Sequence, residues 1–352
     1  MRIAVVDLVC VHGGGYSVLN SLFTYVASGM QKKHEWLFVV SSQEFESNDY
    51  VKVNHFPNAA SGYLQRVKTE WHDVNKVLNN FVPDIVLSMP NIRVLGCKWK
   101  QAVYMQQSLP FQKIKRFSFF KKEERACAFR QHIQGFLIRK SLEKSDMVFV
   151  QTEWVRCALE ECICNRQIIK IGYPIDQIDS SLVIQAKRLN LEFFYPASPY
   201  IYKNHQVIFD AIKILRKKGY FPKIYLTLDP SDLGTKVSDA IECIGQQSKK
   251  QIRELYARTT LVFPSYIETV GLPLAEARAA GTWIIASDCP FSHEVLDGYS
   301  NCEYFDPFDA TKLADCMERV MTGEAAWRPV PYKSDATEIS CWDKMIRCLE
   351  LA

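Results

Sequence analysis

The sequence lacks the signatures of several protein classes. It contains no CxxC pair, and none of its 7 histidines completes a zinc-ligand spacing with the 12 scattered cysteines. No run approaches the roughly 18 uncharged apolar residues of a membrane span. Asp7 interrupts the short apolar run at the N-terminus, which argues against a secretory signal. We therefore expect a protein of the reducing cytosol whose cysteines are core residues.

Neither sign of charge predominates, since the net charge is only +4. Composition alone thus gives no reason to expect a nucleic-acid partner. The chain of 352 residues is 48% hydrophobic and 23% charged, which is ordinary for a globular protein. Its length predicts about two domains, because single cores stop growing at roughly 250–300 residues.

Short apolar runs alternate with segments of helical period in both halves of the chain. The expected strands of the first half are "RIAVVDLVC", "WLFVVSS", "DIVLSMP", "KQAVYMQQ" and "SDMVFVQT". Those of the second half are "LEFFYPAS", "KIYLTL", "IECIG", "TLVFPS" and "WIIASD". This alternation predicts an α/β protein with two Rossmann-like domains, each a parallel sheet with helices on both faces.

The domain boundary is expected near "IGYPIDQIDSS", where glycine, proline and two aspartates interrupt the periodicity. The predicted first domain spans 1–172 and the second spans 173–336. The last amphipathic segment, 337–352, is expected to cross back to the first domain.

The most informative stretch is "PSYIETVGLPLAEARAAGTW", residues 264–283. It follows an expected strand, and ligands in open α/β sheets bind beyond the carboxyl ends of strands. Gly271 permits close backbone approach, and Pro273 suits the first position of the next helix. That helix start presents N–H groups and partial positive charge to a diphosphate, and Glu276 in its first turn is placed to bind a ribose. Glu268, before the glycine, is placed to reach a sugar.

Two glutamates at this spacing also occur on ordinary surfaces, because the helix dipole alone favours an acid in the first turn. The longer segment "FPSYIETVGLPLAEARAAGTWIIASD" is more specific. It resembles the donor-binding segment of the family-four retaining glycosyltransferases, which have the two-domain GT-B fold. The resemblance implies that Glu268 contacts the donor sugar and Glu276 the ribose. It also implies that the loop backbone contacts the diphosphate through Thr269, Val270, Gly271 and Leu272.

Other segments agree with this resemblance. "SPYIYKNHQVIFDAI" is similar to the strand–loop–helix in which a lysine holds the diphosphate, and Lys203 matches that lysine. "IECIGQQ" places Gly245 near the uracil or guanine. "HGGGYS" resembles the first glycine turn of the family, which implies that Gly14 and Gly15 line the cleft near the donor phosphate and the acceptor. An ordinary turn fits these glycines equally well, and a dinucleotide fingerprint would need a glycine where Val18 stands.

The sequence departs from the family at two positions. Ser198 stands where many members have an arginine that helps to hold the diphosphate. Gln106, or alternatively Gln107, stands where many members have a histidine near the donor sugar. We carry Lys203, Glu268 and Gln106 as the candidate catalytic residues.

The resemblance implies a metal-independent retaining hexosyltransferase that needs no cofactor and no protein nucleophile. In size and architecture, the chain resembles bacterial enzymes that build O-antigen or other surface polysaccharide on undecaprenyl diphosphate. The expected donor is a UDP-N-acetylhexosamine, with N-acetylgalactosamine ahead in an α linkage, while UDP-hexose and GDP-mannose stay open. The alternatives are a sugar-nucleotide epimerase of the same architecture and a non-catalytic nucleotide-sugar-binding subunit.

Residues 113–144 form a basic, aromatic stretch, with ten cations against three acids. Five phenylalanines lie among them: Phe117, Phe119, Phe120, Phe129 and Phe136. This pattern predicts contact with an anionic membrane surface. Together with the resemblance to the bacterial polysaccharide enzymes, it implies a peripheral protein at the inner face of the bacterial plasma membrane. The alternative is an ordinary helix with its aromatics in the core. No motif in the stretch supports nucleic acid.

Overall fold

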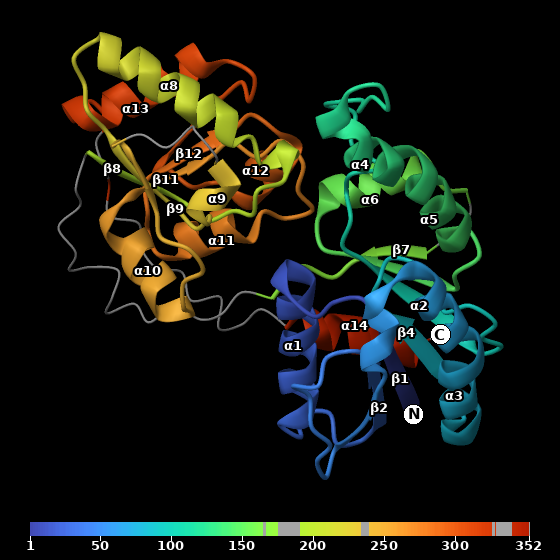
Figure 1. The fold of residues 1–352 in the computed structure, drawn as a ribbon. Helices are drawn as coiled ribbons and strands as arrows, with labels where there is room; N and C mark the ends of the chain where they lie inside the picture. The colour runs from blue at the N-terminus through green and yellow to red at the C-terminus, as the bar shows by residue number, and fades with distance from the viewer. Residues whose placement is uncertain (165–166, 175–190, 234–238, 326–327, 329–339, 352) are drawn as a thin grey trace. The chain divides into compact units, whose positions relative to one another are not determined.

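The computed structural model describes residues 1–164, 167–174, 191–233, 239–325, 328 and 340–351 (Figure 1). The predicted boundary between residues 336 and 337 lies outside these ranges. The chain divides into two compact units. Unit 1 comprises Met1–Phe119, Arg125–Pro174 and Glu338–Ala352, and unit 2 comprises Phe120–Glu124 and Ile175–Thr337.

Unit 1 contains a seven-stranded parallel sheet in the order β3-β2-β1-β4-β5-β6-β7. The strands are β1 Arg2–Asp7, β2 Glu35–Val40, β3 Val51–His55, β4 Ile85–Ser88, β5 Lys100–Met105, β6 Met147–Val150 and β7 Gln167–Lys170. The central strands are nearly continuous apolar runs because both faces of the sheet are covered. The sequence missed β3 and β7, which lie at the sheet edges and are partly exposed, so neither carries a continuous apolar run.

The helices of unit 1 cover both faces of its sheet. They are α1 Gly13–Ala27, α2 Tyr63–Thr69, α3 Asn75–Phe81, α4 Arg125–Ala128, α5 Gly135–Leu142, α6 Glu153–Glu160 and α14 Cys341–Glu350. Two π-helical turns, η2 Glu70–Val74 and η4 Phe129–Gln134, join α2 to α3 and α4 to α5. Short 3₁₀ helices are η1 Pro57–Ser61 and η3 Lys122–Glu124. Side chains of β1 alternate between the faces: Ile3 packs with α1 and α14, and Ala4 packs with α3.

Helix α14 returns to unit 1 and completes its core. Trp342, Met345 and Leu349 are buried in the same cluster as the inward residues of β1, β2 and α1. The Trp342 indole N–H donates to Ser21 Oγ at 3.1 Å, and the Tyr25 hydroxyl donates to Asp343 Oδ1 at 2.5 Å. The predicted return of the C-terminal helix is therefore confirmed.

Unit 2 contains a six-stranded parallel sheet in the order β10-β9-β8-β11-β12-β13. Its strands are β8 Glu192–Tyr195, β9 Lys223–Leu226, β10 Ile241–Cys243, β11 Thr260–Phe263, β12 Ile284–Ser287 and β13 Cys302–Phe305. Its helices are η5 Ile201–Lys203, α8 His205–Lys217, α9 Pro230–Leu233, α10 Lys249–Arg258, α11 Leu272–Ala279, α12 Pro290–Val295 and α13 Ala310–Thr322. The sequence missed β13, another partly exposed edge strand.

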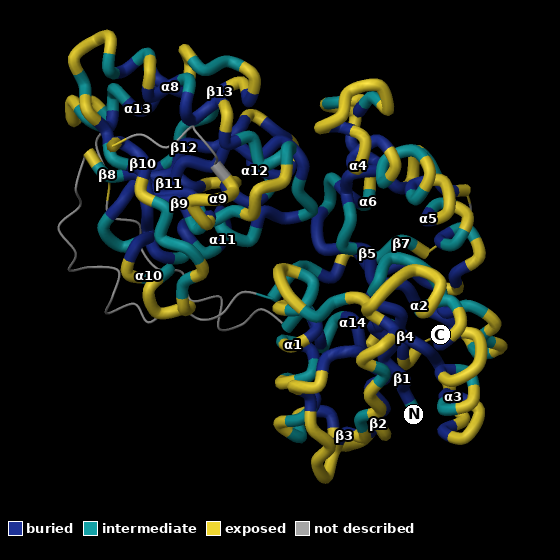
Figure 2. The backbone as a smooth tube through the Cα atoms, viewed as in Figure 1, coloured by how far each residue is buried: buried dark blue, intermediate teal, exposed yellow. Residues whose placement is uncertain are grey.

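Burial follows the layered pattern in each unit. Figure 2 shows the central strands as deeply buried segments, with exposure in loops, on outer helix faces and at the edge strands. The two parallel sheets with helices confirm the predicted α/β class with Rossmann-like domains. None of the helices in the described ranges is long and apolar enough to cross a membrane.

Candidate active site

The strand order of unit 2 creates a switch point between β8 and β11. From β8 the chain runs to one side through β9 and β10, and from β11 it runs to the other side through β12 and β13. Loops that leave neighbouring strands at such a point diverge and leave room for a ligand beyond the carboxyl ends. Lys203 follows β8 and Glu268 follows β11, so the topology places both candidates at this point.

The structure brings Lys203 and Glu268 together. The Lys203 Nζ donates to Glu268 Oε1 in an ion pair, and the two side chains are 17% and 14% exposed. Lys203 Nζ also lies 5.6 Å from the centre of the Tyr202 ring. The pair is thus shielded from bulk water but reachable by a ligand, and the interaction of its charges is stronger than on an open surface.

Backbone contacts fix the two loops against each other. The Tyr266 amide donates to the Tyr202 carbonyl at 3.1 Å, and the buried Tyr195 hydroxyl donates to the Lys203 carbonyl at 2.8 Å. Asn204 has left-handed backbone, with φ of 60°. Its side-chain amide donates to the carbonyls of Pro264 at 3.3 Å and Pro307 at 2.6 Å. These bonds hold the backbone that carries Lys203 in place.

Gly271 ends the loop and precedes α11. Its φ of +75° is a left-handed conformation that favours glycine. A Cβ there would also lie 3.3 Å from atoms of the Phe263 and Leu274 side chains. Helix α11 begins at Leu272, so Pro273 is its second residue rather than the first as predicted. The second N–H also has no partner inside a helix, which is why proline is tolerated there.

Glu276 lies just beyond the first turn of α11, in which the sequence placed it. It is the fifth residue of the helix and not part of its first turn. The buried Tyr256 on α10 donates its hydroxyl to Glu276 Oε2 at 3.1 Å. This contact orients the half-buried carboxylate, and a carboxylate held in this way can accept hydrogen bonds from the hydroxyls of a ligand.

His205 lies beside Lys203 at the start of α8. Its ring is buried, and its centre is 5.0 Å from that of Tyr195. Among the described residues, no hydrogen-bond partner faces its Nε2. Burial, with a smaller contribution from the Lys203 charge, lowers the pKa of His205 from 6.5 to about 4. The imidazole is therefore neutral near pH 7 and adds no second cation to this part of the site.

The remaining unit 2 candidates line the same edge of the sheet less directly. Gly245 follows β10 with φ of +64°, and a Cβ there would meet no atom within 4 Å. Its amide donates to the Leu228 carbonyl at 3.2 Å. Val270 is buried, whereas Thr269 and Leu272 are half-buried. Their contacts with a nucleotide stay predictions.

In unit 1 the structure brings Gly15 and Gln106 together. A Cβ on Gly15 would lie 3.8 Å from Gln106 Oε1 and only 2.6 Å from Cys10 Sγ, so a larger residue there would require the Cys10 side chain to shift. Gln106 follows β5. Its backbone N–H donates to Asn91 Oδ1 at 2.5 Å, and its side-chain Nε2 donates to the Met89 carbonyl at 3.2 Å. Helix α1 begins at Gly13, so Gly14 and Gly15 belong to its first turn and not to a loop before it. Their binding role stays a prediction.

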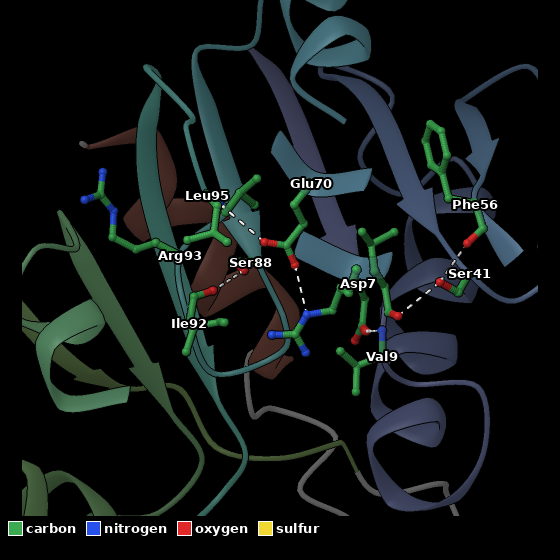
Figure 3. A network of polar contacts seen from close by, with 12 residues as sticks. Asp7, Val9, Ser41, Phe56, Glu70, Ser88, Ile92, Arg93 and Leu95 are labelled. Atoms are coloured by element: carbon green, nitrogen blue, oxygen red, sulfur yellow. Dashed lines mark hydrogen bonds and ion pairs between the residues drawn. The ribbon is translucent and has the colours of Figure 1, made fainter. Parts of the chain in front are cut away.

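Polar contacts that the sequence did not reveal shape this edge of unit 1 (Figure 3). Asp7 is buried and its Oδ1 accepts the amides of Val9 at 2.8 Å and Cys10 at 2.9 Å. Burial raises the pKa of Asp7 above its usual 3.8. The Ser41 hydroxyl contacts the carbonyls of Leu8 and Phe56, both at 3.1 Å. These contacts fix the turn between β1 and α1.

Sequence reasoning also missed the partners of the unit 2 candidates. Tyr195, Tyr256 and His205 have no motif of their own, and only the packing of the sheet and helices shows their contacts with the site. Among the described residues, no group of three or more His, Cys, Asp or Glu side chains is arranged to hold a metal ion. Independence from metals stays a prediction.

A comparison with protein families matches residues 190–330 to the glycosyl transferases group 1 model. Unit 2 carries a group 1 glycosyltransferase domain. This matched range includes Lys203, Gly245, Glu268, Gly271 and Glu276. The candidate residues of unit 2 thus belong to the part of the chain that the family model covers, whereas Gly14, Gly15 and Gln106 lie outside it.

The chain is also similar to the O-antigen chain mannosyltransferase RfbU of Salmonella typhimurium. The two are 25% identical over 196 residues, which cover 53% of this chain and 54% of the Salmonella protein. The chain thus matches about half the length of this relative.

Solved structures resemble the chain over nearly its whole length. Sucrose-phosphate synthase from Thermosynechococcus elongatus matches with a TM-score of 0.74 and 14% identity, covering 99% of this chain and 98% of that one. WaaG, a glycosyltransferase involved in lipopolysaccharide biosynthesis, matches with 0.67 and 15% identity over 92% of each chain. The UDP-GlcNAc 2-epimerase from Methanocaldococcus jannaschii matches with 0.56 and 13% identity over 100% of each. At such identities the likeness shows the fold, which is the GT-B class of two Rossmann-like domains.

Proposed function

We propose that this protein is a retaining glycosyltransferase that moves a sugar from a nucleotide donor to a lipid-linked glycan in O-antigen or lipopolysaccharide assembly. The observation that carries the proposal is the Lys203–Glu268 pair at the switch point of a group 1 glycosyltransferase domain. A lysine at the carboxyl edge of the sheet suits a diphosphate, and a carboxylate beside it suits the hydroxyls of a sugar. The similarity to the Salmonella O-antigen protein supports the proposed product.

The residues divide the proposed chemistry between them. The diphosphate leaves from the face that the acceptor hydroxyl attacks, so no protein nucleophile is needed. Lys203 and the N–H groups around Gly271 stabilise the charge that develops on the leaving phosphate. Glu276, oriented by Tyr256, binds the ribose, and Glu268 positions the sugar. The chain needs no metal in this scheme.

The donor proposed first is UDP-N-acetylgalactosamine, transferred in an α linkage. A mannosyl donor is the second choice, because the similar Salmonella protein is a mannosyltransferase. The acceptor proposed is a saccharide on undecaprenyl diphosphate. Such an acceptor places the enzyme at the inner face of the plasma membrane, with residues 113–144 toward the anionic lipid.

The deciding experiment is nucleotide release from a panel of UDP- and GDP-sugars, with and without an undecaprenyl-diphosphate-linked monosaccharide. We expect release from one donor that depends on the acceptor. Conversion of a UDP-sugar without acceptor would instead support an epimerase, the function that the likeness to UDP-GlcNAc 2-epimerase favours second. Donor binding without turnover on any acceptor would support a non-catalytic binding subunit.

Two substitutions test the residue assignments. We expect Glu276→Ala to weaken donor binding and Glu268→Ala mainly to lower turnover. Unchanged kinetics in both variants would overturn the assignment while leaving the reaction itself to the release assay.

A further inference from the structure

The continuous helical segment of α4, η4 and α5 carries large apolar side chains on its outer surface. Those of Phe129, Ile133, Phe136 and Leu137 are 48%, 48%, 59% and 50% exposed. Phe119, which is 45% exposed, adds to this surface because its ring lies 5.7 Å from that of His132 on η4. We name these five side chains the apolar ridge. Isolated exposed apolar residues are normal, whereas a row of them marks an interaction surface.

The ridge is exposed because the inner face of the same segment is already packed. Cys127, Ala128, Ile138 and Leu142 are buried, and a Cβ on Gly135 would lie 2.7 Å from Pro110 Cβ. Positions 129, 133, 136 and 137 follow the spacing of one helical face, opposite to this packed side. Of the phenylalanines in residues 113–144, only Phe117 is buried. The alternative prediction, in which the aromatic side chains of this stretch fill the core, is therefore wrong for Phe119, Phe129 and Phe136.

Cations flank the ridge residues along the sequence. Residues 113–144 hold ten lysines and arginines against three glutamates, an excess of seven positive charges. Arg116 and Lys144, which belong to unit 1 as the ridge does, are exposed, and within the described part of the chain no carboxylate pairs with them. Lys140 is also exposed, although it contacts Glu143 at 2.8 Å.

We propose that the apolar ridge enters the outer part of an anionic bilayer while these cations contact lipid phosphates. Apolar helix faces flanked by lysine and arginine bind in this way, about 5–10 Å into the headgroup and acyl boundary. The excess of positive charge in this segment favours an anionic lipid surface, because each lysine or arginine near such a surface contributes about 1 kcal/mol to binding. The inference deepens the proposed function, since a lipid-linked acceptor lies in such a membrane.

The test is sedimentation of the full chain with vesicles, without donor or acceptor. We expect binding to vesicles that contain phosphatidylglycerol and little binding to pure phosphatidylcholine. Phe136→Ser, and more strongly Phe129→Ser combined with Phe136→Ser, should lower the partition coefficient by about tenfold or more. Lys144→Glu should weaken binding several-fold at low salt, and added salt should reduce this difference.

Matched controls separate the ridge from general surface effects. Phe221→Ser changes a phenylalanine of unit 2 that is 70% exposed, and Lys213→Glu reverses an exposed lysine on α8. Both should bind vesicles as the unaltered protein does. The proposal would be overturned if the ridge variants bound vesicles as well as the unaltered protein, or if neutral and anionic vesicles bound the protein equally. A dimer that forms without lipid and that Phe136→Ser dissociates would also overturn it. The vesicle assay omits the sugar donor, so a failure to bind vesicles does not decide whether the protein transfers a sugar. Likewise, a failure to release nucleotide does not decide whether the ridge binds lipid.

Discussion

The ammonium of Lys203 and the carboxylate of Glu268 form an ion pair that joins the loop after β8 to the loop after β11. Without a ligand, each charge is thus neutralised by the other. A donor diphosphate would compete with Glu268 for Lys203, and the carboxylate it displaces would become available to the sugar.

The pair predicts opposite effects on product binding and on turnover. In Glu268→Gln the side chain keeps its shape but loses the charge that competes with the diphosphate. We expect the nucleoside diphosphate to bind a few-fold more tightly, while kcat falls by roughly 10²-fold because a positioning contact is weakened. Calorimetric titration and steady-state kinetics measure the two effects. Weaker nucleotide binding by this variant would show that the ion pair does not oppose the ligand.

The contact between Tyr256 and Glu276 predicts a change in donor affinity without a change in chemistry. Tyr256→Phe keeps the buried ring and removes the hydroxyl that orients the carboxylate. We expect the donor KM to rise a few-fold at nearly constant kcat, and the free energy of unfolding to fall by about 1–2 kcal/mol.

Tyr299→Phe is the matched control, because it removes a buried hydroxyl that donates to the Thr282 carbonyl at 2.6 Å. It should lower stability by a similar amount and leave the donor KM unchanged. Equal KM values in both variants would remove Tyr256 from the site.

Gly271 predicts a combined loss of stability and binding. Gly271→Ala places a Cβ in a left-handed conformation and 3.3 Å from Phe263 and Leu274. We expect a loss of roughly 1–3 kcal/mol in the free energy of unfolding, with weaker nucleotide binding because the loop must shift. Denaturant titration and nucleotide binding measure both.

Gly219→Ala separates the two causes. Gly219 also has positive φ, but a Cβ there meets nothing within 4 Å. This variant should lose about 1 kcal/mol and bind nucleotide normally. If Gly271→Ala bound nucleotide as well as this control, the close approach at the loop would be irrelevant to the ligand.

His205 predicts a loss of stability in acid. Its folded pKa of about 4 lies below the ordinary 6.5, so the unfolded chain takes up a proton that the folded chain does not. The associated stability is complete above pH 6.5 and is lost as the pH falls toward 4. The loss amounts to roughly 3 kcal/mol.

Denaturant titrations of the unaltered protein and of His205→Gln, at about pH 4 and pH 7.5, measure this difference. The variant should depend less steeply on pH. Lys203 and Tyr195 face the histidine in both proteins, so their contributions largely cancel in the comparison. Parallel pH curves would show that His205 is not the group that titrates.

The sequence by itself determined the class of the fold, because apolar runs separated by helical periods leave little choice but parallel sheets covered on both faces. It also determined the candidate residues of unit 2, since Glu268, Gly271 and Glu276 lie within one continuous motif. It did not determine the edge strands β3, β7 and β13, whose partly exposed residues carry no continuous apolar signal.

Only the tertiary structure decided which of these residues meet. Lys203 and Glu268 are 65 residues apart, and they pair because β8 and β11 are neighbours at a switch point. Glu276 is oriented by a tyrosine from another helix, and Gln106 reaches Gly15 because strands β1, β4 and β5 lie side by side. The apolar ridge shows the same limit. The sequence predicted a membrane-facing stretch but left open whether its aromatics fill the core, and the structure decides this because the opposite face of the helix is the one that packs against the protein.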